Sequence, residues 1–216
     1  MGSTGRFLIF LGGEPVPYSR FEGLVPHSFL LACDSGIELL LKNGLYPDVF
    51  IGDLDSVGQN VISLIRPHIK KFYQFPREKD KTDSELGVEY ALNSRAGEIV
   101  IVGGLGRRLD HSLANIMLLF KINSAGVSGY ILGARERVFY LPDDFELKAR
   151  PGLTFSLIPF GRVTKLNISG ARYPLINGEL DPGSSLGVSN YLEGEFLKIK
   201  KEGGPLFMVL LDEEVR

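Results

Sequence analysis

The stretch Pro47-Asp48-Val49-Phe50-Ile51-Gly52-Asp53-Leu54-Asp55-Ser56 is an apolar strand that delivers two carboxylates to its own end. Residues two apart on an extended chain point the same way, with Cα atoms roughly 6–7 Å apart, so Asp53 and Asp55 can face one cation. At a separation of about 5 Å and an effective dielectric near 20 the two charges repel by about 3 kcal/mol, and a bound divalent cation turns this into attraction. The stretch predicts a magnesium and phosphate site. A solvated turn with local hydrogen bonds is the alternative for an isolated Asp-x-Asp.

A second acidic loop follows the apolar run 29–33, which is typical of a buried strand. Asp34 and Ser35 come directly after this run, and a helical pattern over 37–42 follows them. Gly44 supplies the usual signal for a helix C-terminus. The segment is therefore expected to fold as strand, polar loop and helix in succession.

A third acidic loop precedes another helical pattern. Thr82 and Glu85 have the spacing of a capping box, so Asp83 is expected in the first turn of that helix. Capping and the helix dipole account for these three residues without any ligand. They do not account for Asp80, which stands in the same loop.

A glycine-rich turn, Gly103-Gly104-Leu105-Gly106-Arg107-Arg108-Leu109-Asp110-His111, joins the apolar run 99–102 to a helical pattern over 112–122. Glycine backbone at such a turn can approach phosphate closely, and the helix N-terminus adds partial positive charge. Arg107 and Arg108 are then placed to clamp phosphate oxygens. The turn matches neither the Walker A pattern nor the dinucleotide fingerprint, so a plain glycine turn with two solvated arginines stays open as an alternative.

Composition describes a globular chain without strong charge bias. The 216 residues include 24 basic and 26 acidic side chains, for a net charge of −2, and 44% are hydrophobic. This size suffices for one large domain or two modest ones. The charge gives no electrostatic reason to expect nucleic acid as a partner.

The expected location is the cytoplasm. Cys33 is the single cysteine, so no intramolecular disulfide can form, and its place in an apolar run predicts a small buried side chain. No apolar run reaches the roughly 18 residues of a membrane span, and no secretory pattern opens the chain. Residues 1–5 are small and polar, as expected of a frayed end.

Apolar runs and turn signals predict two domains. In the first part of the chain short apolar runs alternate with helical patterns, which is typical of a parallel α/β sheet. The strands expected there are 7–11, 29–33, 49–51, 72–75, 99–102 and 130–132. Beyond about residue 135, turn signals such as Asn177-Gly178 separate short runs, which favours antiparallel strands. The strands expected there are 138–141, 155–158, 164–168, 186–189, 196–200 and 207–211. We predict a Rossmann-like α/β domain over 1–136 and an all-β sandwich over 137–216.

In an open parallel sheet the loops at the strand ends line one crevice, which is the expected ligand site. Taken in order, the motifs in these loops resemble those of the thiamin pyrophosphokinase family over about 80 residues. The matching residues are Asp34-Ser35-Gly36, Pro47-Asp48, Gly52-Asp53-Leu54-Asp55-Ser56, Asp80-Lys81-Thr82-Asp83, and Arg108-Leu109-Asp110-His111 with Asn115. A second stretch, 170–190, resembles the thiamin-side domain of the family.

The resemblance implies transfer of a pyrophosphoryl group from ATP to the thiamin hydroxyl, with magnesium, giving AMP and thiamin diphosphate. The candidate metal ligands are Asp53, Asp55 and Asp83. Asp80 joins them as a catalytic carboxylate, and Asp80 or Asp83 is the candidate acceptor of the hydroxyl proton. The residues expected to bind ATP are Asp34, Ser35, Arg108, Asp110, His111 and Asn115. For His111, a structural hydrogen bond at the helix start is an alternative to direct chemistry.

For the second domain, the sequence pattern alone indicates only an all-β module. By resemblance, Ser189 and Asn190 match a Ser-Asn pair near the thiamin pyrimidine, and Tyr173 matches the aromatic position beside it. Without the resemblance, Ser189-Asn190 would be interpreted as a turn. The resemblance also implies a homodimer in which each site is built from two chains.

Three positions depart from the family pattern. Ser35 stands where many members have a second glycine, and Arg107 stands where a glycine often precedes the arginine. Tyr173 occupies a place often held by tryptophan. None of the departures removes a carboxylate. Those at Ser35 and Arg107 affect the expected shape of the phosphate loops, and that at Tyr173 affects how strongly an aromatic face stacks on the substrate ring.

Two other classes of protein fit part of the pattern. A metal-dependent glycosyltransferase can hold a nucleotide-sugar diphosphate with an Asp-x-Asp pair, but it does not predict the acidic element at 80–83. A non-catalytic thiamin or nucleotide binder would keep the fold, yet we would expect it to have lost some of the carboxylates. All of them are present in the sequence.

Overall fold

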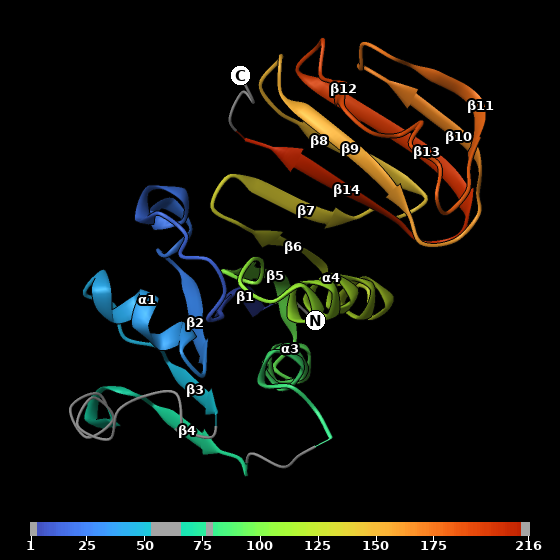
Figure 1. Cartoon of the computed structure of the whole chain (residues 1–216). Coiled ribbons are helices and arrows are strands. Elements are labelled where there is room, and N and C mark those ends of the chain that lie inside the picture. The colour runs from blue at the N-terminus through green and yellow to red at the C-terminus, as the bar shows by residue number, and fades with distance from the viewer. Residues whose placement is uncertain (1–3, 53–65, 77–79, 213–216) are drawn as a thin grey trace. The chain divides into compact units, whose positions relative to one another are not determined.

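The computed structural model describes residues 4–52, 66–76 and 80–212. The chain divides into two compact units, Met1–Ala134 and Arg135–Arg216 (Figure 1). Within the described ranges, no helix combines the length and the apolar character that a membrane-spanning segment requires.

A parallel sheet forms the centre of the first unit, with the strand order β6-β5-β1-β2-β3-β4. Its strands are β1 (Thr4–Phe10), β2 (Ser28–Cys33), β3 (Val49–Gly52), β4 (Lys71–Gln74), β5 (Ala96–Val102) and β6 (Ser128–Leu132). Every strand predicted in this part of the chain is present, with small shifts at the ends. The sequence prediction of a parallel sheet here is thereby confirmed.

Helices cover both faces of this sheet (Figure 1): α1 (Gly36–Lys42) lies on one face, and α3 (Asp83–Asn93) and α4 (Leu109–Ser124) lie on the other. On the α1 face, Ile37 packs into a core cluster with Leu8 and Phe10 of β1. On the α3 face, Gly87 lies against Ile9 and Leu31, which come from neighbouring strands. Because both faces of the sheet are covered at its centre, the inner strands β2, β3 and β5 appear in the sequence as largely continuous apolar runs.

The helix ends follow the predicted signals. After α1, Gly44 has a φ of +69°, the left-handed conformation that glycine adopts without strain. At the start of α3 the Thr82 hydroxyl accepts a hydrogen bond from the backbone N–H of Glu85 at 3.2 Å, and Asp83 lies in the first turn as predicted. Short 3₁₀ segments are Tyr18–Arg20, Glu22–Leu24 and Arg66–His68.

The second unit consists of two antiparallel sheets, with the orders β12-β9-β14-β7 and β11-β10-β13-β8. Its strands are β7 (Glu136–Tyr140), β8 (Asp144–Lys148), β9 (Thr154–Pro159), β10 (Val163–Ser169), β11 (Leu175–Leu180), β12 (Asn190–Tyr191), β13 (Phe196–Gly203) and β14 (Leu206–Leu211). Side chains alternate along β10 and β13 between buried and more exposed positions, as expected where one face of a sheet packs on a core. The predicted all-β sandwich is therefore present.

One predicted strand of this unit is wrong. Residues 186–189 form a turn, in which the Val188 N–H donates to the Ser185 carbonyl at 3.0 Å and the Leu186 N–H to the Ser184 hydroxyl at 3.3 Å. Leu186 is 63% exposed, so the apolar run buries little surface. Local bonds to serine oxygens compete with strand pairing here, and the regular strand begins only at Asn190.

The sequence prediction also missed two strands, β8 and β11. Asn177-Gly178, expected as a turn between strands, lies inside β11. There Asn177 has a φ of +50°, its N–H donates to the Asn167 side chain at 3.0 Å, and the register of β11 against β10 shifts nearby. An Asn-Gly pair is suited both to a hairpin turn and to a bulge within a strand, because each of these structures requires a residue with left-handed backbone.

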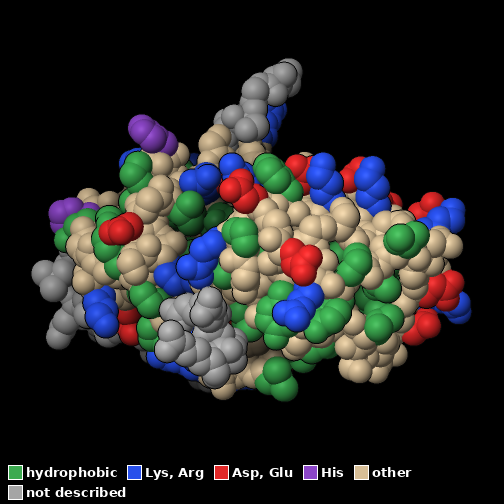
Figure 2. Space-filling model, turned by 90° about the horizontal axis from the view of Figure 1, so that it is seen from above, with side chains coloured by type: hydrophobic (Ala, Val, Ile, Leu, Met, Phe, Trp, Pro, Cys, Tyr) green, Lys and Arg blue, Asp and Glu red, His purple; other side chains and the backbone are tan. Residues whose placement is uncertain are grey.

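Basic and acidic side chains are interspersed over the face seen in Figure 2, with apolar side chains between them. Several charges of opposite sign pair across neighbouring strands, such as Lys198 with Glu146 and Lys200 with Asp144, both at 2.9 Å. Exposed pairs of this kind contribute little to stability. Each pair brings opposite charges together, so β8 and β13 do not present an extended field of a single sign where these pairs lie.

A charged network links α3 to α4 in the first unit. Lys121 of α4 donates to Glu85 at 2.9 Å and to Glu89 at 2.5 Å. Lys81, from the loop before α3, donates to both oxygens of Glu89 at 2.8 Å. The hydrogen bond from Lys121, followed by that from Lys81, holds the pKa of Glu89 below its ordinary value.

Replacing Glu89 with Gln should lower the free energy of unfolding by about 0.5–1 kcal/mol at neutral pH, since it removes the charge shared by two lysines. A depressed folded-state pKa means that the contribution is full above the unfolded value of about 4.3 and is lost as pH falls through the folded value. Urea unfolding from pH 7 down to about pH 3 should show the wild-type and variant curves converging below about pH 4.3. Glu146→Gln, which loses one exposed pair, is the control; a gap for Glu89→Gln that persists at the lowest pH would contradict the assignment.

Candidate active site

A cavity of about 670 Å³ opens at the carboxyl ends of β1, β2 and β5 in the first unit. β1 pairs with β2 on one side and with β5 on the other, so the chain order reverses at this point of the sheet. Open α/β sheets bind ligands at such a reversal because the loops on its two sides diverge and leave a crevice. The lining residues are Leu11, Gly12, Gly13, Cys33, Asp34, Ser35, Asp80, Lys81, Thr82, Asp83, Ser84, Gly104, Gly106, Arg107, Arg108, His111 and Asn115.

Glycine allows the loops after β1 and β5 to approach each other. The Gly13 N–H donates to the Gly103 carbonyl at 2.9 Å, and the Glu14 N–H donates to the Leu105 carbonyl at 2.7 Å. A β-carbon at Gly13 would collide with the carbonyl oxygens of Gly103 and Leu105. The two loops therefore form one continuous wall of backbone, of the kind that can approach a phosphate closely.

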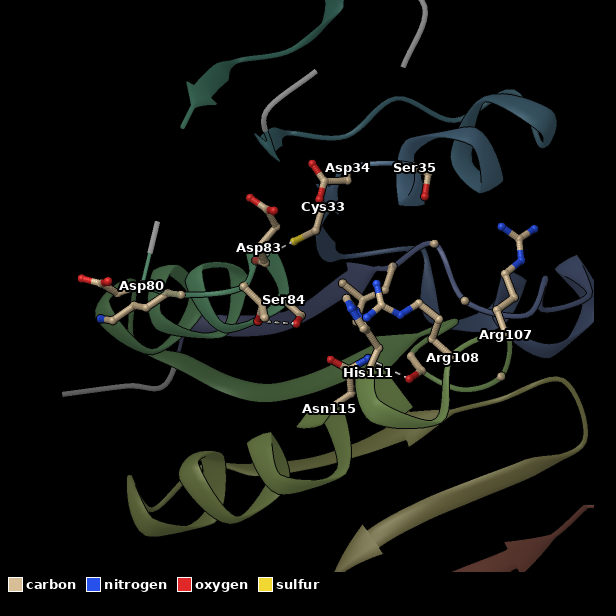
Figure 3. A pocket seen from close by; sticks show the side chains of 17 residues that line it. Cys33, Asp34, Ser35, Asp80, Asp83, Ser84, Arg107, Arg108, His111 and Asn115 are labelled. Carbon is tan, nitrogen blue, oxygen red and sulfur yellow. Dashed lines mark hydrogen bonds between the residues drawn. The ribbon is translucent and has the colours of Figure 1, made fainter. Parts of the chain in front are cut away.

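Carboxylates occupy one side of the cavity. Asp34, at the end of β2, has a φ of +46°, a conformation uncommon outside glycine and found at functional sites. Asp83 lies in the first turn of α3, and the Cys33 thiol donates to its backbone carbonyl at 3.2 Å (Figure 3). Asp80 stands in the loop before α3 and also lines the cavity. Three of the predicted acidic residues are thus brought together from two loops far apart in the sequence.

The donor set suits a hard cation. Mg²⁺ is bound by one or two carboxylates together with waters and phosphate oxygens, so Asp34 and Asp83 have the right chemistry. A β-carbon at Gly52 would collide with the Asp34 carboxylate, so the end of β3 lies directly against that group. Asp53 and Asp55, the predicted ligands that follow Gly52 in the sequence, lie outside the described residues. Among the residues that are described, no group of three acidic, His or Cys side chains is close enough to hold a metal.

Arginines occupy another side of the cavity. Arg108 donates to Asp110 through both Nε (3.1 Å) and a terminal nitrogen (2.6 Å). This bond, with smaller contributions from His111, lowers the pKa of Asp110 to about 2 despite some opposing desolvation. Asp110 was predicted to bind ATP, but it does not line the cavity. It instead holds the guanidinium of Arg108, which does line the cavity.

Side chains from the first turns of α4 hold the glycine-rich loop. Asn115 is buried, and its side-chain amide donates to the Gly104 carbonyl at 2.8 Å. The Ser112 hydroxyl donates to the Arg108 carbonyl at 2.9 Å. His111 is exposed and lines the cavity, one turn before Asn115. Asn115 therefore fixes the loop, while His111 is open to a ligand.

Several lining residues were not assigned from the sequence. Gly12 and Gly13 directly follow the apolar run 7–11. A strand that ends in glycines is the same signal that predicts a phosphate-binding turn after the run 99–102, so it could have revealed this loop as well. Cys33 was interpreted only as a small buried side chain, and it is 3% exposed, but its thiol also contacts the Asp83 backbone. No local pattern could have revealed that contact, because the two residues are 50 positions apart.

In the second unit, Asn190 organises the predicted thiamin-side residues. Its side-chain oxygen accepts from the N–H groups of Tyr173 (3.0 Å) and Tyr191 (2.8 Å), and its amide donates to the Tyr173 carbonyl at 2.8 Å. Asn190 is buried, whereas Tyr173 is 59% exposed. Ser189 has a φ of +58°, and its N–H donates to the Ser156 hydroxyl at 3.1 Å. Asn190 thus holds the backbone of Tyr173 while the aromatic ring faces outward.

Comparison with known proteins agrees with this organisation. Residues 23–131 match the family model of the thiamin pyrophosphokinase catalytic domain, and residues 144–204 match that of the thiamin pyrophosphokinase vitamin B1 binding domain. The thiamine pyrophosphokinase of Bacillus subtilis is 30% identical over 169 residues, which cover 77% of this chain and 79% of that protein. Thiamin pyrophosphokinase 1 of Caenorhabditis elegans is 25% identical over 99% of this chain and 92% of its own length.

Solved structures show the same likeness. The crystal structure of thiamine pyrophosphokinase from Bacillus subtilis superposes with a TM-score of 0.87 at 28% identity, over 97% of this chain and all of that chain (100%). The structure from Geobacillus thermodenitrificans gives a TM-score of 0.84 at 29% identity, over 97% and 99% of the two chains. With both domain models matched in order along the sequence, the chain belongs to the thiamin pyrophosphokinase family.

Proposed function

We propose that this enzyme, a thiamine pyrophosphokinase by its family, transfers the pyrophosphoryl group of ATP to the hydroxyl of thiamin and releases AMP and thiamin diphosphate. The observation that carries the proposal is one cavity lined by both carboxylates and guanidinium groups, at the point where the strand order reverses. This arrangement suits a polyphosphate, which needs both a chelated cation and direct cationic contacts. The strand order also supports the Rossmann-like description of the first unit.

Magnesium is the proposed cofactor, held by Asp53, Asp55 and Asp83; Asp34, whose carboxylate lies against Gly52, is a further candidate ligand. When bound, the ion would neutralise charge on the phosphate oxygens and keep the β-phosphorus open to attack. The residues of the chain then have separate tasks. The glycine backbone of the loops after β1 and β5 can accommodate the phosphates, and Arg108, held by Asp110, can contact their oxygens. His111 and Ser35 line the same cavity and are proposed to contact ATP.

The proton of the attacking hydroxyl needs an acceptor. Asp80 and Asp83 are the proposed candidates, because both line the cavity on its carboxylate side. Asp80 is exposed and Asp83 is half-buried. A carboxylate that does not hold the metal is the better acceptor, since a coordinated oxygen is less basic; this favours Asp80 if Asp83 is a ligand.

Incubation with ATP, magnesium and thiamin should yield AMP and thiamin diphosphate in equal amounts, measured by chromatography. ADP with thiamin monophosphate would mean single phosphoryl transfer, and no turnover would favour a binding protein.

Asp83→Asn should lower kcat by about 10²-fold or more, because the carboxylate is lost while its shape is kept. Glu38→Gln, which removes an acidic residue from the first turn of α1 outside the cavity, is the matched control and should keep full activity. Asp55→Ala is likewise expected to abolish turnover.

Tyr173, Ser189 and Asn190 are the proposed thiamin-side residues, with the Tyr173 ring as the aromatic face beside the substrate. Asn190→Ala should remove three side chain–backbone hydrogen bonds and lower the free energy of unfolding by about 1–3 kcal/mol, because a buried backbone group loses its partner. It should also raise KM for thiamin more than KM for ATP, since the backbone of Tyr173 is released. Denaturant unfolding and steady-state kinetics measure the two effects.

Asn167→Ala is the control for that variant, because Asn167 also makes side chain–backbone bonds but is exposed. It should leave KM for thiamin unchanged. An Asn190→Ala enzyme whose KM for thiamin stays within about twofold of wild type would remove Asn190 as a positioning residue for the substrate.

We further propose a cytoplasmic homodimer whose sites are shared between chains. Support comes from large apolar side chains exposed on the second unit, among them Ile176 at 88%, Leu186 at 63% and Phe196 at 45%. Where such residues form a contiguous patch they are typical of interaction surfaces, and these three are therefore the candidates for the subunit contact. The single Cys33 permits no intramolecular disulfide, which suits a reducing compartment.

Sedimentation should give a particle of twice the 23.8 kDa chain mass. If the sites are shared, co-expression of Asp83→Asn with Tyr173→Ala should restore about a quarter of wild-type activity, because half of the dimers are mixed and each mixed dimer holds one intact site. A mixture no more active than its two components would mean that each chain builds its site alone.

A further inference from the structure

The loop after β5 contains an arginine in a strained turn. Gly106 and Arg107 have φ values of +82° and +55°, and the Arg108 N–H donates to the Gly106 carbonyl at 2.6 Å. This bond spans three residues and places Arg107 at their centre with a positive φ. Turns of this kind are rare and strained for any residue with a β-carbon, whereas glycine adopts positive φ freely.

The strained turn at Arg107 forms part of the wall of the cavity. Arg107 lines it, beside Arg108 and in the same loop (Figure 3). Strained residues that persist at the edge of a binding site are candidates for a role in the site, because the surrounding fold has to maintain them.

The three long cations of the cavity differ in what they contact. Arg108 is bonded to Asp110 through two nitrogens, and Lys81 is bonded to both oxygens of Glu89. Arg107 is exposed and makes no ion pair or hydrogen bond through its side chain to any residue in 4–52, 66–76 or 80–212. Within the described chain, it is the guanidinium of this cavity that can meet an anion without first leaving a carboxylate.

We propose that Arg107 is a phosphate-binding residue of this cavity, held in a strained turn so that its guanidinium meets the polyphosphate chain of the nucleotide. The assignment rests on the proposed use of ATP. A guanidinium offers a planar fork of donors that matches two phosphate oxygens, and it stays charged at any working pH. Asp34, Asp80 and Asp83 stand apart from Arg107 across the cavity in Figure 3, so a polyphosphate chelated at the carboxylates still has oxygens for the guanidinium.

The proposal predicts opposite signs for affinity and stability in one variant, Arg107→Gly. The dissociation constant for ATP with magnesium, measured by calorimetry, and KM for ATP should each rise about fivefold to tenfold. The Tm should not fall, and it should rise by up to about 4 °C because glycine relieves the strained φ. Inorganic tripolyphosphate should lose affinity in parallel, whereas adenosine, which has no phosphate, should bind unchanged. The affinity of the variant for ATP should also depend less on salt concentration than that of wild type.

Arg95→Gly is the matched control. Arg95 is an arginine with a φ of +60°, it follows α3, and it does not line the cavity. The same substitution there should leave the affinity for ATP unchanged. Arg107→Lys keeps the charge but not the planar fork, and it should lie between wild type and Arg107→Gly.

An affinity for ATP and for tripolyphosphate that stays within about twofold in Arg107→Gly would overturn the proposal, as would an equal loss in Arg95→Gly. Turnover by the wild-type enzyme is measured separately. If wild type binds ATP but makes no thiamin diphosphate, the proposed function fails while the binding experiment on Arg107 still decides its own question. If wild type is active and Arg107→Gly binds normally, only the role of Arg107 is lost.

Discussion

The close approach of backbone at the carboxyl ends of β1, β2 and β5 is the constraint on which the site depends. A parallel sheet buried on both faces sends all of these ends to one edge. The loops there can meet only where side chains are missing, as at Gly13 against two carbonyl oxygens and at Gly52 against Asp34. A β-carbon at Gly13 would push apart the loops after β1 and β5, and a β-carbon at Gly52 would displace the Asp34 carboxylate.

Charge in the cavity is balanced by pairing at its margins. Asp110 orients Arg108, and Glu89 holds Lys81 and Lys121, so these three cations already have acidic partners without a ligand. Asp34, Asp80 and Asp83 line the same cavity, and repulsion among carboxylates falls when a cation lies between them. Such a lining suits the metal and the polyphosphate that we propose as ligands.

Left-handed backbone occurs in the candidate functional loops of both units. Asp34 and Arg107 adopt positive φ at the cavity, and Ser189 does so beside Asn190 in the second unit. Each conformation is held by neighbouring bonds, such as that from the Ser189 N–H to Ser156. Positive φ is not confined to these loops, because Arg95 has a φ of +60° outside the cavity; Asp34 and Arg107 differ from it in that they also line the cavity.

The sequence by itself determined the strands of the parallel sheet, the Thr82 cap and the stop signal at Gly44 after α1, because burial period and capping are local properties of the chain. Only the tertiary structure decided which side chains meet. Asp110 turns to Arg108 and does not line the cavity, and the Cys33 thiol bonds to the Asp83 backbone. Such partners depend on how closely distant loops approach each other, which the sequence does not specify. The strand expected at 186–189 was wrong for a related reason. Local hydrogen bonds to Ser184 and Ser185 compete there with strand pairing, and a sequence pattern does not show which of the two is more stable.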